Sequence, residues 1–124
     1  MQDDTVTPGP DLTIARPEPG VAVITLNRPK ARNALSLALM TALHQAIGDA
    51  GHDDAVAAVV IAANGPVFCS GHDLKEMTAH RTDADGGRAF FETTMQSCTA
   101  LMRSIVACPK PVIAPVQVRA TSDK

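Results

Sequence analysis

The chain has 124 residues and a formal net charge of -2 at pH 7; 45% of its residues are hydrophobic and only 2% are aromatic. A chain of this length fits one domain, with a core built mainly from aliphatic side chains. The weak negative charge argues against binding to nucleic-acid phosphates, and the scarcity of aromatic side chains argues against stacking on single-stranded bases. We therefore expect no nucleic-acid partner.

The cysteines and the N-terminus indicate a cytoplasmic protein. Cys69, Cys98 and Cys108 are odd in number and lack metal-site spacing, so we expect free thiols and no metal. Residues 1–11 are polar, contain prolines and lack the apolar segment of a secretory signal, which predicts a flexible N-terminal leader. The longest apolar run, residues 55–63, is too short to span a bilayer. We expect no membrane association.

The first predicted elements are two strands, residues 12–16 and 21–26. The turn between them is rich in proline and glycine, which favours a hairpin. After a loop with three cations, Ser36 is a candidate N-cap for a helix that runs to about Ala50. The apolar face of this predicted helix consists of Leu37, Leu39, Met40, Leu43 and Ile47.

Residues 55–62 form an apolar run without polar alternation, which predicts a fully buried strand. The segment that follows, residues 66–77, reads PVFCSGHDLKEM. Small residues and a glycine between a strand and a helix allow a turn whose backbone N–H groups point outward. Such N–H groups are able to stabilise a developing negative charge.

The last part of the sequence predicts a helix and a short strand. A polar linker, residues 80–87, precedes a long helical pattern over residues 88–107, in which Phe91 and Met102 are among the expected apolar positions. Residues 112–116 predict a strand that Pro115 places at an edge or an end. Strands that alternate with helices indicate an α/β fold with crossover connections.

Three blocks of sequence resemble the enoyl-CoA hydratase/isomerase (crotonase) family. They are ITLNRPKARNALS at residues 24–36, FCSGHDLKEM at residues 68–77 and PKPVIAPVQ at residues 109–117. Their order and spacing also fit the family. The resemblance spans residues 12–117, roughly the first half of a usual family member. It implies an incomplete crotonase-like ββα spiral with a small parallel sheet and flanking helices.

The resemblance implies an acyl-CoA thioester as substrate, with no cofactor beyond the coenzyme A of the substrate itself. Two backbone N–H groups in this family polarise the thioester carbonyl and stabilise an enolate. The resemblance assigns the first of these to the N–H of His72, so that its imidazole need not take part. The residues that the resemblance places beside the coenzyme A portion are Lys30, Ala31, Arg32, Ala34, Ser70, Gly71, Asp73 and Leu74.

Several of these residues also have a simpler structural interpretation. Asp73 suits a helix cap as well as a ligand contact. The cations Arg28, Lys30 and Arg32 are candidates to meet phosphates, but without the resemblance they would indicate an ordinary solvated loop. Cys69 is expected to be a small buried thiol rather than a nucleophile. Lys75 and Glu76 are predicted to face solvent.

The sequence departs from the family after residue 117. The family continues with a glycine-rich segment that carries the second N–H donor, and later with the acid and base glutamates. Here residues 118–124 read VRATSDK. We therefore interpret residues 12–117 as the N-terminal part of a crotonase-like acyl-CoA-binding domain and residues 118–124 as a divergent polar tail.

This departure predicts a truncated family member that is inactive alone. The alternatives are a non-catalytic fragment that binds acyl-CoA or a partner, and an unstable fragment. The resemblance also implies a trimer or hexamer, whose contacts rely partly on segments that this sequence lacks.

Overall fold

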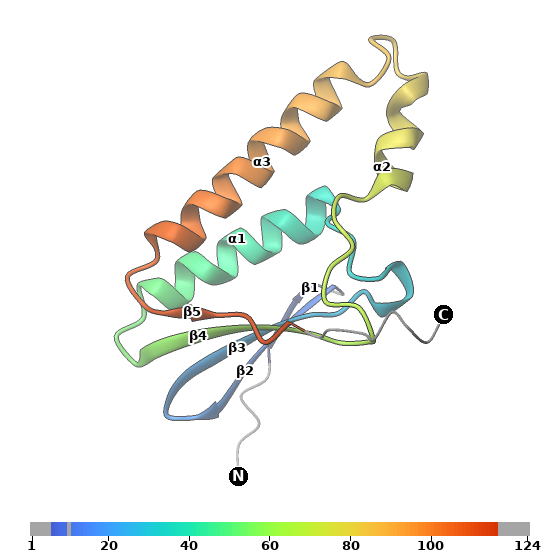
Figure 1. Cartoon of the computed structure of the whole chain (residues 1–124). Helices are drawn as coiled ribbons and strands as arrows, with labels where there is room; N and C mark the ends of the chain where they lie inside the picture. Colours follow the sequence, from blue (N-terminus) through green and yellow to red (C-terminus); the bar gives the residue numbers. More distant parts are fainter. Residues whose placement is uncertain (1–5, 10, 117–124) are drawn as a thin grey trace.

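The computed structural model describes residues 6–9 and 11–116 of the chain. Within these residues, five strands form one sheet in the order β1-β2-β3-β4-β5. Helices α1 and α3 lie on one face of this sheet, and α2 lies beside the far end of α3 (Figure 1). The strands are β1 (Val6–Gly9), β2 (Leu12–Glu18), β3 (Gly20–Leu26), β4 (Val56–Ala63) and β5 (Val112–Ile113). The helices are α1 (Leu37–Gly51), α2 (Leu74–Ala79) and α3 (Arg88–Ala107), with 3₁₀ turns η1 (Pro29–Ala31) and η2 (His80–Thr82).

The sheet topology confirms the predicted α/β class. Strands β2 and β3 form the expected antiparallel hairpin, with Ile14 opposite Ile24. Strand β4 is parallel to β3, with Ile24 opposite Ile61, and β5 is parallel to β4. Parallel neighbours require crossover connections. Helix α1 lies in the first crossover, and α2 and α3 lie in the second.

Strand β1 differs from the flexible leader predicted for residues 1–11. Residues 6–9 pair antiparallel with β2, so that Val6 lies opposite Ile14 and Gly9 opposite Leu12. The sequence hides this strand because it contains Pro8 and Gly9, which are poor strand formers. An edge strand tolerates proline because half of its N–H groups have no ladder partner. The rest of the predicted leader, apart from Asp11, and the predicted tail over residues 118–124 lie outside the described residues.

The core lies between the sheet and α1. The predicted cap is confirmed, since Ser36 Oγ accepts a hydrogen bond of 3.1 Å from Leu39 N at the start of α1. One face of α1 is buried, as the periodic spacing of its apolar residues predicts, although Leu37 is only partly buried. Full burial of one such aliphatic side chain contributes about 2 kcal/mol. The buried core comprises Leu12, Ala22, Ile24, Leu26, Leu39, Met40, Leu43, Ala46, Ile47, Ala50, Val56, Val59, Ile61 and Leu101.

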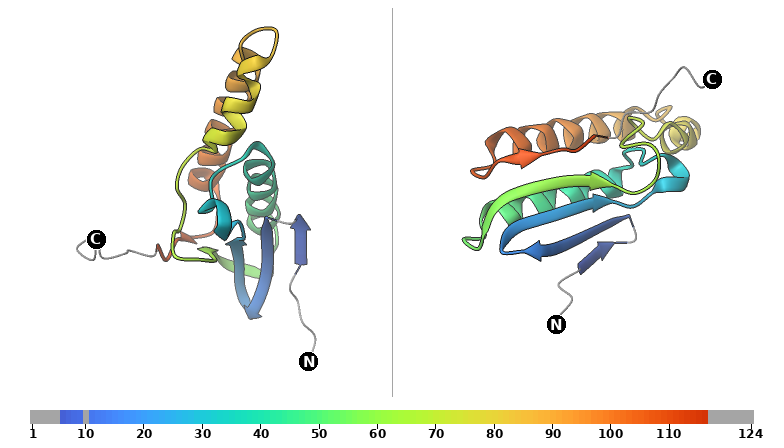
Figure 2. Two further views of the ribbon diagram at one scale, coloured as in Figure 1. Left: turned by 90° about the vertical axis from the view of Figure 1, so that its right-hand side faces the viewer. Right: turned by 60° about the horizontal axis from the view of Figure 1, so that its bottom comes forward.

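Strand β4 is half-buried, whereas the sequence predicts a fully buried strand. Val56, Val59 and Ile61 face the core, but Ala57 is exposed. The reason is that both α1 and α3 cover the same face of the sheet, and in the described part of the chain no helix covers the other face (Figure 2). The apolar residues of β4 therefore lie on both faces of the sheet, the face covered by helices and the uncovered one.

Helix α3 has the predicted bounds, but two residues of its predicted apolar face are exposed. Leu101 is fully buried, whereas Phe91 is 50% and Met102 is 45% exposed, so the expectation that Met102 belongs to the core is wrong. Figure 1 shows that the N-terminal part of α3 projects beyond α1. Strand β5 ends at Ile113, and the exposed fraction of Ile113 is 53%. Among the described helices, none is long and apolar enough to cross a membrane.

The side chain of Asn33 joins the segment after β3 to the segment after β4. Asn33 is fully buried and has a φ of 54°, a left-handed conformation that asparagine tolerates better than most residues. Its Oδ1 accepts from Arg28 N at 2.8 Å, and its Nδ2 donates to Asn64 O and to Val67 O, each at 2.9 Å. A single buried amide therefore satisfies three backbone groups from two loops.

Replacement of Asn33 is expected to destabilise the fold. The variant Asn33→Ala leaves three backbone groups without their partner, and we expect the free energy of unfolding to fall by about 2–4 kcal/mol. The variant Asn33→Gly removes the same bonds but relieves the strain of a positive φ, so we expect a somewhat smaller loss. Urea denaturation monitored by circular dichroism measures both.

The matched control is Asn64→Ala. The Asn64 side chain makes an exposed hydrogen bond to Asn27, and loss of an exposed contact usually changes stability by no more than about 0.5 kcal/mol. Equal destabilisation by Asn33→Ala and Asn64→Ala would contradict the special role of the buried amide.

Candidate functional site

The predicted site residues gather around one hollow. The loop after β3 and the loop before α2 meet beside the N-terminus of α1 (Figure 1). They border an open hollow of about 600 Å³. Of the residues that the resemblance selects, only Gly71 does not line the hollow, and it lies between two that do. The lining residues are Arg28, Lys30, Ala31, Arg32, Ala34, Ser70, His72, Asp73, Leu74 and Lys75.

A parallel backbone bridge between Leu35 and His72 joins the two loops. Leu35 N donates to Gly71 O at 2.7 Å, and Asp73 N donates to Leu35 O at 3.1 Å. In a parallel pair one residue bonds to the two neighbours of the residue opposite it. The N–H of His72 itself is therefore not used by the bridge, and it has no acceptor within residues 6–9 and 11–116.

Gly71 gives the loop the backbone conformation that leads to this amide. Its φ is +101°, a value that residues with a side chain rarely adopt. A Cβ atom at this position would have no heavy atom within 4 Å. The glycine is therefore required by backbone conformation and not by lack of space, in keeping with the predicted turn. A further bond, from Ser70 N to Arg32 O at 3.1 Å, holds the other end of the turn against the first loop.

Asp73 combines two structural roles at the edge of the hollow. Its Oδ1 accepts from Glu76 N at 3.1 Å, which confirms the interpretation as the N-cap of α2. Its Oδ2 forms an ion pair of 3.1 Å with Arg28 Nη2. The Asp73 side chain is only 13% exposed. Both oxygens of the carboxylate are therefore engaged within the protein.

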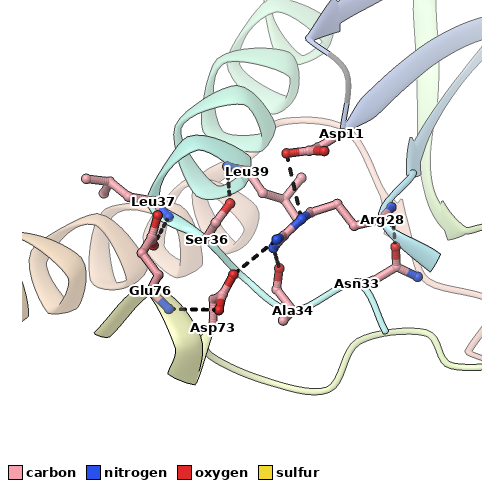
Figure 3. A network of polar contacts seen from close by, with 9 residues as sticks. All are labelled: Asp11, Arg28, Asn33, Ala34, Ser36, Leu37, Leu39, Asp73 and Glu76. Carbon is pink, nitrogen blue, oxygen red and sulfur yellow. Dashed lines mark hydrogen bonds and ion pairs between the residues drawn. The ribbon is translucent and has the colours of Figure 1, made fainter. Parts of the chain in front are cut away.

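Glu76 reaches from α2 to the N-terminus of α1. Its Oε1 accepts from Leu37 N at 2.9 Å (Figure 3), so it supplements the cap made by Ser36. The prediction that Glu76 faces solvent is wrong, whereas Lys75 is exposed as predicted. Sequence reasoning misses this contact because the glutamate caps a helix other than its own, and its partner Leu37 is 39 residues away in sequence.

The three cations of the first loop have different environments. The guanidinium of Arg28 donates to Ala34 O and pairs with Asp73, and it lies 3.7 Å from Asp11 Oδ2. Lys30 and Arg32 are exposed, and their side chains form no ion pair with the described residues. Of the three loop cations, Lys30 and Arg32 thus keep a charge that no described residue pairs.

The pKa of the Asp73 carboxyl is lowered. Burial opposes its ionisation, but hydrogen bonds from Glu76 N and from the Arg28 guanidinium outweigh that effect. No group of histidine, cysteine, aspartate and glutamate side chains suited to hold a metal ion occurs in the described part of the chain. The one acid at the hollow is thus held as a paired carboxylate.

This lowered pKa makes stability depend on pH. Because the folded pKa lies below the unfolded one, the contribution of Asp73 is complete above the unfolded pKa and is lost as the pH falls through the folded pKa. We expect Asp73→Asn to lower the free energy of unfolding by about 1–2 kcal/mol at neutral pH. The difference from the unmodified chain should shrink as the pH falls below about 5.

Urea denaturation between neutral and acidic pH measures this difference. The control is Asp54→Asn, because Asp54 is exposed and its carboxylate has no bond or ion pair among the described residues. A difference for Asp73→Asn that stays constant as the pH falls would contradict the linkage.

Known proteins resemble most of this chain. Residues 16–122 match the family model described as enoyl-CoA hydratase/isomerase. The mitochondrial enoyl-CoA hydratase domain-containing protein 3 of Rattus norvegicus is 38% identical over 113 residues, which cover 91% of this chain and 36% of the relative. The chain thus spans little more than a third of the length of this curated relative.

Solved structures show the same partial match. An enoyl-CoA hydratase of Mycobacterium smegmatis is 47% identical with a TM-score of 0.77, covering 87% of this chain and 40% of the other. The human enoyl Coenzyme A hydratase domain-containing protein 3 is 36% identical with a TM-score of 0.74, again over 40% of its chain. Sequence and structure together show that this chain belongs to the enoyl-CoA hydratase/isomerase family.

Proposed function

We propose that the hollow is part of an acyl-CoA thioester site, in which the backbone N–H of His72 donates to the thioester carbonyl. The observation that carries this proposal is the unpaired His72 N–H, held in place by the Leu35 bridge beside a cavity that the predicted coenzyme A residues line. Family membership supports the substrate class. The proposal concerns a backbone group, so it assigns no role to the imidazole.

The chemistry follows from where negative charge develops. When a thioester forms an enolate, charge accumulates on the carbonyl oxygen. A preorganised donor aimed at such an oxygen is worth roughly 3 kcal/mol. The two backbone bonds that flank His72, at 2.7 and 3.1 Å, keep its N–H fixed before the ligand arrives. No reorganisation is then needed when the charge forms.

The cations at the rim suit the phosphates of coenzyme A. Lys30 and Arg32 are exposed beside the hollow, and the guanidinium of Arg32 is suited to bidentate contact with phosphate. Arg28 is not proposed as a phosphate contact, because Asp73 and Ala34 occupy its guanidinium. Ser70 and Leu74 complete the proposed boundary of the ligand.

A second proposal concerns turnover: we infer that the chain binds acyl-CoA without hydrating it. Hydration requires a positioned acid and base. Among the residues that line the hollow, Asp73 is the only carboxylate and is already paired. Glu76 accepts from Leu37 N. The described residues thus supply no free carboxylate pair beside the proposed donor.

The role of the backbone donor is tested with His72→Pro. Proline removes the N–H, yet no hydrogen bond among the described residues is lost, because the bridge uses the N–H groups of Leu35 and Asp73. An aryl-conjugated acyl-CoA, whose absorption band moves to longer wavelength when its carbonyl is polarised, serves as the probe. We expect His72→Pro to lose most of this shift while it still binds the coenzyme A portion.

The control is His72→Ala, which retains the backbone N–H. The imidazole Nδ1 is buried without a partner in the described part of the chain, so its removal should not lower stability. We expect the full band shift from His72→Ala. A band shift that survives in His72→Pro, or one that is lost in both variants, would overturn the assignment to the backbone.

The absence of turnover is tested with the purified chain and crotonyl-CoA. Loss of absorbance of the conjugated thioester reports hydration, and isothermal calorimetry reports binding. We expect measurable binding and a hydration rate indistinguishable from that of buffer. Robust turnover would overturn the inference, and a chain without a cooperative melt would identify the unstable fragment instead.

A further inference from the structure

We propose that Arg28 is a positioning residue for the His72 N–H, an inference that rests on the proposed function. Arg28 does not use its charge for the ligand. Its guanidinium bonds to both of the loops that the Leu35–His72 bridge joins, and so determines where the unpaired amide of His72 points.

The guanidinium spans both sides of the bridge. On one side it donates to Ala34 O, the carbonyl directly before Leu35. On the other side its Nη2 donates at 3.1 Å to Oδ2 of Asp73, the residue directly after His72. The bridge itself contributes only two hydrogen bonds, one on each side of His72. The side chain of Arg28 therefore adds a second connection at the same level.

Arg28 is itself held by its surroundings (Figure 3). Its backbone N donates to Oδ1 of the buried Asn33 at 2.8 Å, and its Nε lies 3.7 Å from Asp11 Oδ2. The Arg28 side chain is only 20% exposed. A side chain that is fixed at both its backbone and its guanidinium holds its partners more rigidly than a mobile surface cation would.

The contact requires the shape of arginine. A planar guanidinium donates in fixed directions to two acceptors at once, whereas an ammonium is a compact point charge. The acceptors here are a neutral carbonyl, 6 residues from Arg28 in sequence, and a carboxylate, 45 residues from it. The carboxylates of Asp73 and Asp11 balance the positive charge, which leaves the attraction of phosphates to Lys30 and Arg32.

The experiment compares Arg28→Lys and Arg28→Met with the unmodified chain at saturating aryl-conjugated acyl-CoA, well below the melting temperature. We expect the band shift to fall by at least about half in Arg28→Met and by an intermediate amount in Arg28→Lys. The dissociation constant for coenzyme A alone should change by less than about threefold, because the proposed phosphate contacts remain.

A second measurement needs no ligand. Hydrogen exchange of the Leu35 and Asp73 amides reports the two bonds of the bridge. We expect both to exchange at least about tenfold faster in Arg28→Met, while the amide of Leu43 in the middle of α1 is unchanged. Arg28→Met leaves the carboxylate of Asp73 without its ion-pair partner. If Arg28→Met does not fold for this reason, the double variant Arg28→Met/Asp73→Asn is measured instead.

The matched control is Arg16→Met. Arg16 also forms an ion pair with an aspartate, Asp53, but at the opposite end of α1. The variant Arg16→Met should lower the melting temperature without altering the band shift or the hydrogen-exchange rate of the Leu35 amide. A merely structural role for Arg28 would give this same result.

The outcomes separate the two proposals. A shift that His72→Pro abolishes but Arg28→Met leaves complete, with unchanged exchange at Leu35, overturns the positioning role and leaves the proposed function standing. No shift in the unmodified chain overturns the proposed function. Loss of the shift in both His72→Pro and Arg28→Met, with retained affinity for coenzyme A, supports both.

Discussion

Two backbone hydrogen bonds, from Leu35 to Gly71 and from Asp73 to Leu35, connect the two crossover loops of this chain. The hollow exists only where these loops meet, and the geometry of a parallel bridge leaves the His72 N–H unused. Asn33 reinforces the same junction from within the core by bonding to carbonyls that follow β4. The proposed donor is therefore a consequence of how two connections are joined, and the imidazole of His72 plays no part in creating it.

Electrostatics at the junction favour the same arrangement. The N-termini of α1 and α2 lie close together, and each carries the partial positive charge of unsatisfied N–H groups. Glu76 accepts from the first helix and Asp73 from the second. Arg28 then neutralises Asp73 and donates to the Ala34 carbonyl. The result is a connected set of paired polar groups beneath a rim on which Lys30 and Arg32 remain free for an anion.

Local patterns predict the elements well, because caps and periodicity are short-range features. The hairpin, the N-cap of α1 at Ser36 and the full length of α3 all follow from residues close together in sequence. The errors concern what covers each element. The exposure of one face of β4 and of Met102 depends on which surfaces the helices cover. Strand β1 forms by backbone pairing with β2 at the edge of the sheet, and its residue types do not predict this pairing.

The site shows the same division. The sequence alone determined the glycine turn at Gly71, the cap at Asp73, the cations of the first loop and the family resemblance, since each is encoded by a contiguous motif. Only the tertiary structure decided that Arg28 is an internal clamp, that Glu76 caps another helix and that Asn33 joins two loops. These contacts connect residues 31 to 45 positions apart. Hydrogen bonds over such separations have no periodic signature, because the fold and not the local spacing brings their partners together.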